Sequence, residues 1–178
     1  MPFAYYDRLS PAQQRVYRRS DEITRLRLPE PRALHPPVAA LAAALATEDR
    51  AAVQLAARRL HAGLTQAFGV PPCRLEVLPA RPHGRWGELQ GLYTTAERRR
   101  PAKVTLWMRT ARQRRVVAFR TFLRTLLHEL CHHLDYEHLR LPDSLHTEGF
   151  YKRESSLFHQ LVPEPARAPA PSLEGGAE

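Results

Sequence analysis

Apolar side chains recur at intervals of three and four residues in two long stretches of the chain, a spacing typical of amphipathic helices. The first stretch covers residues 48–68. The second begins near Val116 and ends near 141–143, where a proline interrupts the pattern. A shorter helix is expected at 149–161 and a mostly polar one at 10–28. Helices are therefore predicted on both sides of the middle of the chain.

Between the two long helices the apolar period changes to two, which is typical of strands. Three short strands are predicted, at residues 75–79, 89–95 and 102–109. In the third, Val104, Leu106 and Met108 share one face, as a half-buried strand requires. This order of elements indicates an α+β fold, with a small, mostly antiparallel three-stranded sheet packed on helices.

The length of 178 residues suits one main domain with short appendages. Four prolines fall within residues 28–37, and they predict an irregular linker there. We therefore expect an N-terminal helix and proline-rich linker at 1–37, a domain at 38–162, and a disordered Pro/Ala tail at 163–178.

The composition argues against a membrane-spanning protein and against a disulfide-rich one. No run of about 18 apolar residues is present, so no membrane span is expected. The first residues lack the basic-then-apolar pattern of a signal peptide, so we expect a cytoplasmic protein. With only Cys73 and Cys131, the chain cannot form a disulfide-rich scaffold.

Charge is distributed unevenly along the chain, whose net charge is +9. Residues 1–125 carry 23 Lys and Arg against 9 Asp and Glu, whereas residues 126–178 carry 4 against 9. The Arg-rich region at 98–124 is therefore a candidate surface for DNA or another polyanion. Nearly all basic residues are arginine, however, which codon bias in a GC-rich genome would also produce.

The second long helix contains the segment His128-Glu-Leu-Cys-His132. Residues four apart lie on the same face of a helix, so the two imidazoles can reach one ion, which we expect to be zinc. Glu129 lies near the same edge, where its carboxylate can accept a proton from a metal-bound water. The motif thus supplies two metal ligands and a general base.

A catalytic zinc usually has three protein ligands, so a further donor is expected later in the chain. His138 has the spacing of the metzincin signature, but Asp135 stands where that signature has glycine. Glu148 or Glu154 would suit a carboxylate from the following helix. His146, beyond a proline-interrupted turn, is the preferred candidate.

The HExxH helix followed by His146-Thr-Glu-Gly-Phe150 resembles the SprT-like family of zinc metallopeptidases, which includes the Spartan proteases. The glycine of that family's second motif is Thr147 here, while the phenylalanine keeps its place. The resemblance covers about residues 48–161. It implies a zincin-like fold with HExxH on a long active-site helix, metal ligands His128, His132 and His146, and Glu129 as base.

Other residues near the motif have alternative interpretations. Asp135 either accepts the second N–H of a ligating imidazole or lies on an exposed face. Tyr151 and Arg153 are candidates for stabilising an oxyanion, but no motif supports either of them and surface or packing roles are favoured. Gly91–Tyr93 is a candidate sheet edge along which an extended peptide could align.

The sequence therefore supports two candidate functions. The first is a zinc metallopeptidase that hydrolyses peptide bonds by Glu129-assisted attack of metal-bound water. The resemblance to the SprT-like family implies that its substrates are proteins associated with DNA. The alternative is a basic nucleic-acid-associated or regulatory binding module in which zinc is structural or inactive.

Overall fold

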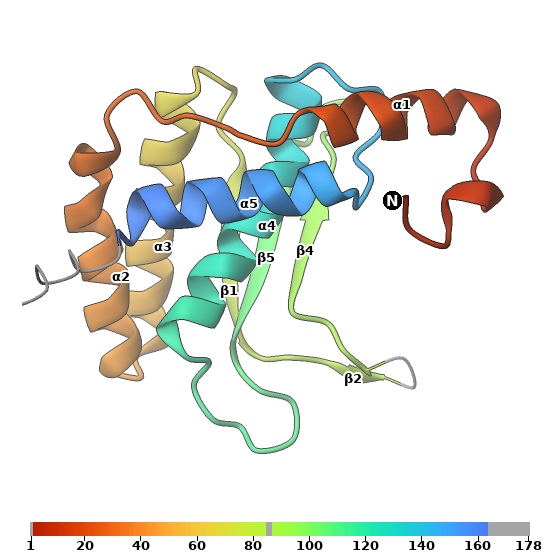
Figure 1. The fold of residues 1–178 in the computed structure, drawn as a ribbon. Coiled ribbons are helices and arrows are strands. Elements are labelled where there is room, and N and C mark those ends of the chain that lie inside the picture. The colour runs from red at the N-terminus through yellow and green to blue at the C-terminus, as the bar shows by residue number, and fades with distance from the viewer. Residues whose placement is uncertain (1, 85–86, 164–178) are drawn as a thin grey trace, which may run out of the picture.

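The computed structural model describes residues 2–84 and 87–163, and it forms helices around one small sheet (Figure 1). The helices are η1 Tyr6–Arg8, α1 Pro11–Glu22, η2 Pro31–Leu34, α2 His35–Ala46, α3 Arg50–Ala67, α4 Phe119–Glu137 and α5 Glu148–Leu161. The strands are β1 Arg74–Ala80, β2 His83–Gly84, β3 Gly87–Glu88, β4 Gly91–Thr94 and β5 Lys103–Arg109. The expected α+β class is confirmed, as are the three longer strands.

The main sheet has the order β1-β5-β4 and is mixed. β5 runs parallel to β1, with Leu75 opposite Val104, and antiparallel to β4, with Tyr93 opposite Val104. The expectation of a mostly antiparallel sheet is therefore wrong. Alternation of apolar residues shows which face of a strand is buried but carries no information about its direction. The short β2–β3 hairpin was not predicted.

One hydrophobic core lies between the sheet and the helices. β5 contributes Val104, Leu106 and Met108 to it, as the alternation predicts. α3 packs against β1, and α4 packs against β4 and β5. Most of the apolar residues of α4 are fully buried, including Leu123, Leu127 and Leu130. The helix that carries the HExxH segment is thus one of the most tightly held elements of the fold.

The ends of α4 differ from the expected ones for local reasons. It begins at Phe119 rather than near Val116, because residues before it continue the sheet: Val116 forms a bridge with Arg109, and Val117 N–H donates to the Met108 carbonyl. It ends at Glu137, and Arg140 follows with a φ of 54°. That left-handed residue reverses the chain, in the manner of a helix C-terminal motif.

The proline-rich segment is more regular than expected. Pro31 opens η2, and α2 begins at His35 with Pro36 and Pro37 in its first turn. The prediction of an irregular linker is wrong here, because proline fits the first turn of a helix, where its missing N–H has no partner to lose. Leu26, Leu28 and Leu34 join the same core as the rest of the domain.

The polar N-terminal helix is shorter than expected and ends at Glu22. Ser10 caps its start, where its side chain and that of Gln13 form a reciprocal capping box. The tail predicted at 163–178 falls outside the described residues from position 164 onward. Across residues 2–84 and 87–163, no helix combines the length and apolar character needed to cross a membrane.

Candidate metal centre

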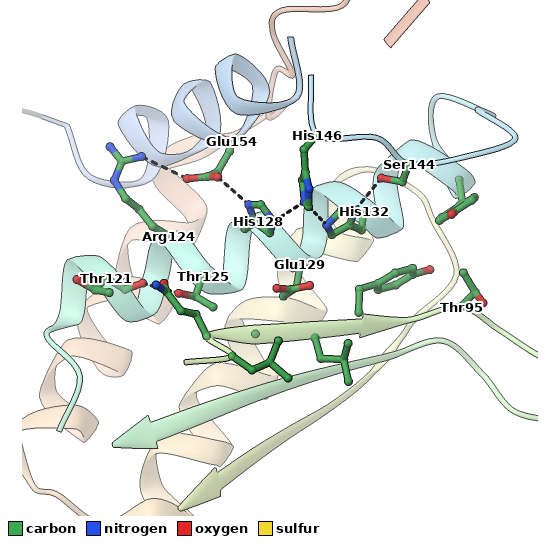
Figure 2. A pocket seen from close by; sticks show the side chains of 16 residues that line it. Thr95, Thr121, Arg124, Thr125, His128, Glu129, His132, Ser144, His146 and Glu154 are labelled. Atoms are coloured by element: carbon green, nitrogen blue, oxygen red, sulfur yellow. Dashed lines mark hydrogen bonds and ion pairs between the residues drawn. The ribbon is translucent and has the colours of Figure 1, made fainter. Parts of the chain in front are cut away.

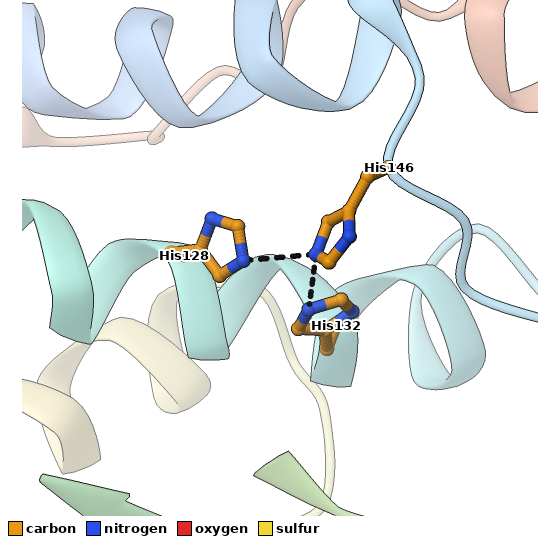
Figure 3. A group of neighbouring side chains, drawn as sticks. All are labelled: His128, His132 and His146. Carbon is orange, nitrogen blue, oxygen red and sulfur yellow. Dashed lines mark hydrogen bonds between the residues drawn. The ribbon is translucent and has the colours of Figure 1, made fainter. Parts of the chain in front are cut away.

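Three histidine side chains converge beside α4 (Figure 3). His128 and His132 lie one turn apart on α4, and His146 comes from the loop between α4 and α5. The Nε2 atom of His146 lies 3.0 Å from Nε2 of His128 and 3.1 Å from Nε2 of His132. Two nitrogens bound to one tetrahedral zinc at about 2.1 Å would lie roughly 3.4 Å apart, so the three rings are already close to ligating positions.

The opposite ring nitrogens of the two helix histidines have acceptor partners (Figure 2). Nδ1 of His128 lies 3.1 Å from Oε2 of Glu154. Nδ1 of His132 lies 2.7 Å from Oγ of Ser144, whose hydroxyl donates to Oδ2 of Asp135 at 2.8 Å. Since the Ser144 proton is directed at Asp135, its oxygen is available to accept from His132. Both imidazoles are therefore protonated on Nδ1.

These tautomers leave an unprotonated Nε2 on both helix histidines, directed at the same point as Nε2 of His146. Burial, together with the neighbouring histidines, lowers the pKa of His132 to about 3. The pKa of His146 is also lowered, first by burial and then by His128. Three imidazole nitrogens that converge beside an open cleft could hold a divalent cation.

The rival third ligands have other roles in the structure. His138 lies past the end of α4 with its ring against Phe68, at a centroid distance of 5.2 Å. Glu148 is largely exposed and pairs with Lys152 at 2.6 Å. Glu154 holds Nδ1 of His128 and also pairs with Arg124 at 3.4 Å. Among the described residues, only His128, His132 and His146 form a group able to hold a metal ion.

Asp135 connects the histidines to a buried ion pair. It is fully buried, so the interpretation as an exposed residue is wrong. Its contact with His132 passes through Ser144, and its other oxygen accepts from Nη2 of Arg153 at 2.8 Å. Arg153 is itself fully buried and donates to the carbonyls of Ser20 and Ile23, so it cannot reach a substrate oxyanion.

Glu129 occupies the space between α4 and β4, and Figure 2 shows its carboxylate pointing from the helix toward the strand. A Cβ atom on Gly91 would collide with Oε1 of Glu129, so this carboxylate fits only because residue 91 is glycine. Burial raises the Glu129 pKa to about 7, although His128 and a hydrogen bond from the Tyr93 backbone partly oppose the shift. A carboxylate with this pKa can both take up and release a proton near neutral pH.

The three histidines and the buried Glu129 line an open cleft of about 720 Å³. Gly91, Leu92 and Tyr93 of β4 form one side, and Thr121, Thr125 and Tyr136 of α4 lie on the other. β4 is an edge strand, as expected for Gly91–Tyr93. The cleft therefore places a sheet edge directly beside the candidate metal ligands.

The two edge strands of the main sheet, β1 and β4, differ in what their outer backbone groups face. On β1, the outer N–H and carbonyl of Val77 bond to Gln54 and Arg50, and Arg58 donates to the Leu75 carbonyl. Side chains of α3 thus provide hydrogen-bond partners for these outer backbone groups of β1. Along β4 the outer side opens into the cleft instead. The outer backbone groups of Leu75 and Val77 are therefore not available to another strand, whereas the outer edge of β4, where the Tyr93 backbone bonds to Glu129, borders the cleft.

No protein family, curated protein or solved structure matches this chain. The metal-binding assignment rests on the convergence of the three imidazoles and on the partners of their second nitrogens. The pattern His128-Glu-x-x-His132 and the later His146 were recognisable in the sequence. The roles of Ser144, Glu154 and Gly91 were not, because each depends on a contact between segments far apart in the chain.

Proposed function

We propose that the protein is a zinc-dependent metallopeptidase of the SprT-like kind, with a zincin-like fold. The observation that carries the proposal is the convergence of Nε2 of His128, His132 and His146 in a cleft that also contains the Glu129 carboxylate. Three imidazoles, and one carboxylate that is not among the metal ligands, are the set of groups that zinc-assisted hydrolysis of an amide requires.

His128, His132 and His146 would hold the ion, and a zinc ion bound there supplies Lewis-acid polarisation of a carbonyl and of water. Glu129 does the proton chemistry: it removes a proton from the attacking water and delivers it to the departing amine. Its pKa of about 7, raised by burial, suits both steps. Glu154, Ser144 and Asp135 keep the imidazoles in the tautomer that presents Nε2.

The β4 edge supports a peptide as the substrate. A substrate strand alongside Gly91–Tyr93 would run along the cleft past Glu129, next to the edge of β4 that does not pair with β5. The cleft is open rather than enclosed around a small molecule, which favours an extended chain. The side chains of Leu89 and Leu92 are exposed at its rim and offer apolar contacts.

The test is the variant Glu129→Gln in the zinc-loaded protein, assayed with unfolded protein or peptide substrates. Loss of the general base should reduce hydrolysis by about a thousandfold while zinc content stays unchanged. Glu137→Gln is the matched control, since Glu137 lies two turns further along α4 and pairs only with Arg140 among the ion pairs of the described chain. Hydrolysis by Glu129→Gln at the rate of the control would refute the proposal.

A second candidate function, binding of DNA or another polyanion, rests on exposed arginines. Two clusters lie in the Arg-rich region: Arg98–Arg100 precedes β5, and Arg112–Arg115 follows it. They lie at opposite ends of this strand, which at about 3.3 Å per residue separates them by roughly 23 Å. Lys103 and Arg109, between them, pair with Glu76 and Glu48.

This candidate predicts DNA binding that weakens steeply with salt. Replacing Arg98, Arg99 and Arg100 by Gln should reduce both the affinity for DNA and its salt dependence. Salt-dependent binding by a zinc-loaded protein that hydrolyses no protein, with or without DNA, would favour the binding module over the peptidase. Absence of DNA binding at low salt would eliminate it.

A further inference from the structure

The N-terminal arm, which we define as residues 3–23, lies against the loop that carries His146. Figure 1 shows α1 crossing beside the start of α5. Tyr5 donates its hydroxyl proton to the carbonyl oxygen of His146 itself, at 2.5 Å. Asp21 accepts a hydrogen bond from the backbone N–H of Gly149 through Oδ1, at 2.8 Å. The arm therefore contacts the loop both at the histidine and three residues after it.

Additional contacts extend along the same segment. Nε2 of Gln13 donates to Oδ2 of Asp143 at 3.4 Å, three residues before the histidine. Oγ of Ser20 lies 3.5 Å from Oγ1 of the buried Thr147. A Cβ atom on Gly149 would collide with the carbonyl of Asp21, so α1 and α5 approach each other closely there. Residues on both sides of His146 are thus bonded to the arm.

The three histidines differ in how their backbones are held. His128 and His132 belong to α4, whose own hydrogen bonds and buried apolar side chains fix their positions. His146 belongs to no helix or strand. Its carbonyl has the Tyr5 hydroxyl as partner, and its ring stacks on Tyr151, which in turn contacts Phe3 edge-on. The position of His146 therefore depends on groups outside its own loop.

We propose that the N-terminal arm is a positioning part of the metal centre: Tyr5 and Asp21 hold the His146 loop where its imidazole can complete the site formed by His128 and His132. The inference rests on the proposed metal centre but not on its catalytic activity. Tyr5 is not one of the three converging side chains, and its role is exerted through the backbone of His146. The arm thus belongs to the functional unit even though it lies outside the segment that resembles the SprT-like family.

The experiment compares Tyr5→Phe with Tyr6→Phe in the full chain. Each variant loses one phenolic hydroxyl in the same segment, but the Tyr6 hydroxyl meets Arg18 rather than the His146 loop. Zinc affinity is measured on the apo protein by competition with a chromophoric chelator, and thermal unfolding of the apo protein is recorded in parallel. We expect about a tenfold loss of affinity for Tyr5→Phe, as for other outer partners of metal ligands, and less than a twofold change for Tyr6→Phe.

A double-mutant cycle separates an effect on the position of His146 from an effect on the general stability of the fold. In a His146→Ala background, Tyr5→Phe should no longer change the affinity for zinc, because the loop then carries no ligand. Equal affinities of Tyr5→Phe and Tyr6→Phe, or an undiminished Tyr5→Phe effect in the His146→Ala background, would overturn the inference. Wild-type protein that binds zinc tightly but hydrolyses no peptide would refute the proposed peptidase and leave this inference standing. Failure of the wild type to bind zinc would overturn both.

Discussion

Two groups of histidines lie on or beside α4, and they differ in which partners their ring nitrogens have. The metal-facing cluster, His128, His132 and His146, directs three Nε2 atoms at one point. The packing cluster consists of His61 and His133 with Cys73. In it, Nε2 of His133 lies 2.8 Å from the Pro71 carbonyl, so that nitrogen carries the proton, and Nδ1 accepts from the Tyr93 hydroxyl at 3.1 Å.

The difference shows that residue type and burial do not make a histidine a ligand. His133 follows His132 directly in the sequence and is more buried, yet both of its nitrogens are occupied by the protein. Nε2 of His61 lies 3.7 Å from Sγ of Cys73, and burial lowers the pKa of His61 to about 4. What distinguishes His128 and His132 is an acceptor at Nδ1, which leaves Nε2 for an outside partner.

The largest difference between the two clusters should appear when one histidine is removed from each: His146 from the metal-facing cluster and His133 from the packing cluster. His146→Ala should lower zinc affinity by about a hundredfold or more, since a four-ligand zinc site is worth about 10–16 kcal/mol in total. His133→Ala should leave zinc affinity nearly unchanged but destabilise the fold by about 2 kcal/mol, because the Pro71 carbonyl and Tyr93 hydroxyl lose their partner. Chelator competition and urea unfolding measure the two quantities. A large loss of zinc affinity in His133→Ala would erase the distinction between the clusters.

A pH experiment tests the packing cluster by itself. The pKa of His61 is lowered from 6.5 to about 4, so between these values the unfolded chain binds a proton that the folded chain does not. Its contribution to stability is present above pH 6.5 and is lost as the pH falls to 4, by up to about 3 kcal/mol. Glu129 acts in the opposite direction, because its pKa is raised to about 7.

The measurement is urea unfolding at pH 7 and pH 4 with a chelator present, in a Glu129→Gln background with and without His61→Gln. The background removes the opposing carboxyl, and the comparison isolates His61. We expect the chain that retains His61 to lose more stability on acidification than the chain that lacks it. Equal losses in the two chains would mean that His61 titrates normally in the folded state.

The smallest effect concerns the hydrogen bond that sets the tautomer of His132. Ser144→Ala removes the acceptor at Nδ1 and should lower zinc affinity by about tenfold. Ser155→Ala is the matched control, since Ser155 also lies beside a histidine, His159, but on the surface of α5. Zinc affinities of the two variants are compared by chelator competition. No difference between them would show that His132 binds zinc without help from Ser144.

Local patterns in the sequence were sufficient for much of the fold. The periods of the apolar residues located the long helix, the helix at Arg50–Ala67 and the three main strands, because each pattern reflects a face buried by its own element. They failed at the proline-rich segment and at the ends of α4. There the outcome depends on how proline fits a first helical turn, and on Val116 and Val117 joining the sheet.

The sequence by itself determined that His128 and His132 share one helical face with Glu129 beside them, because a helix repeats its geometry every turn. Only the tertiary structure decided that His146, rather than His138, Glu148 or Glu154, meets them. It also decided the parallel pairing of β1 with β5 and the partners Ser144 and Glu154. These features join segments separated by many residues, and no local periodicity records which distant segments will pack together.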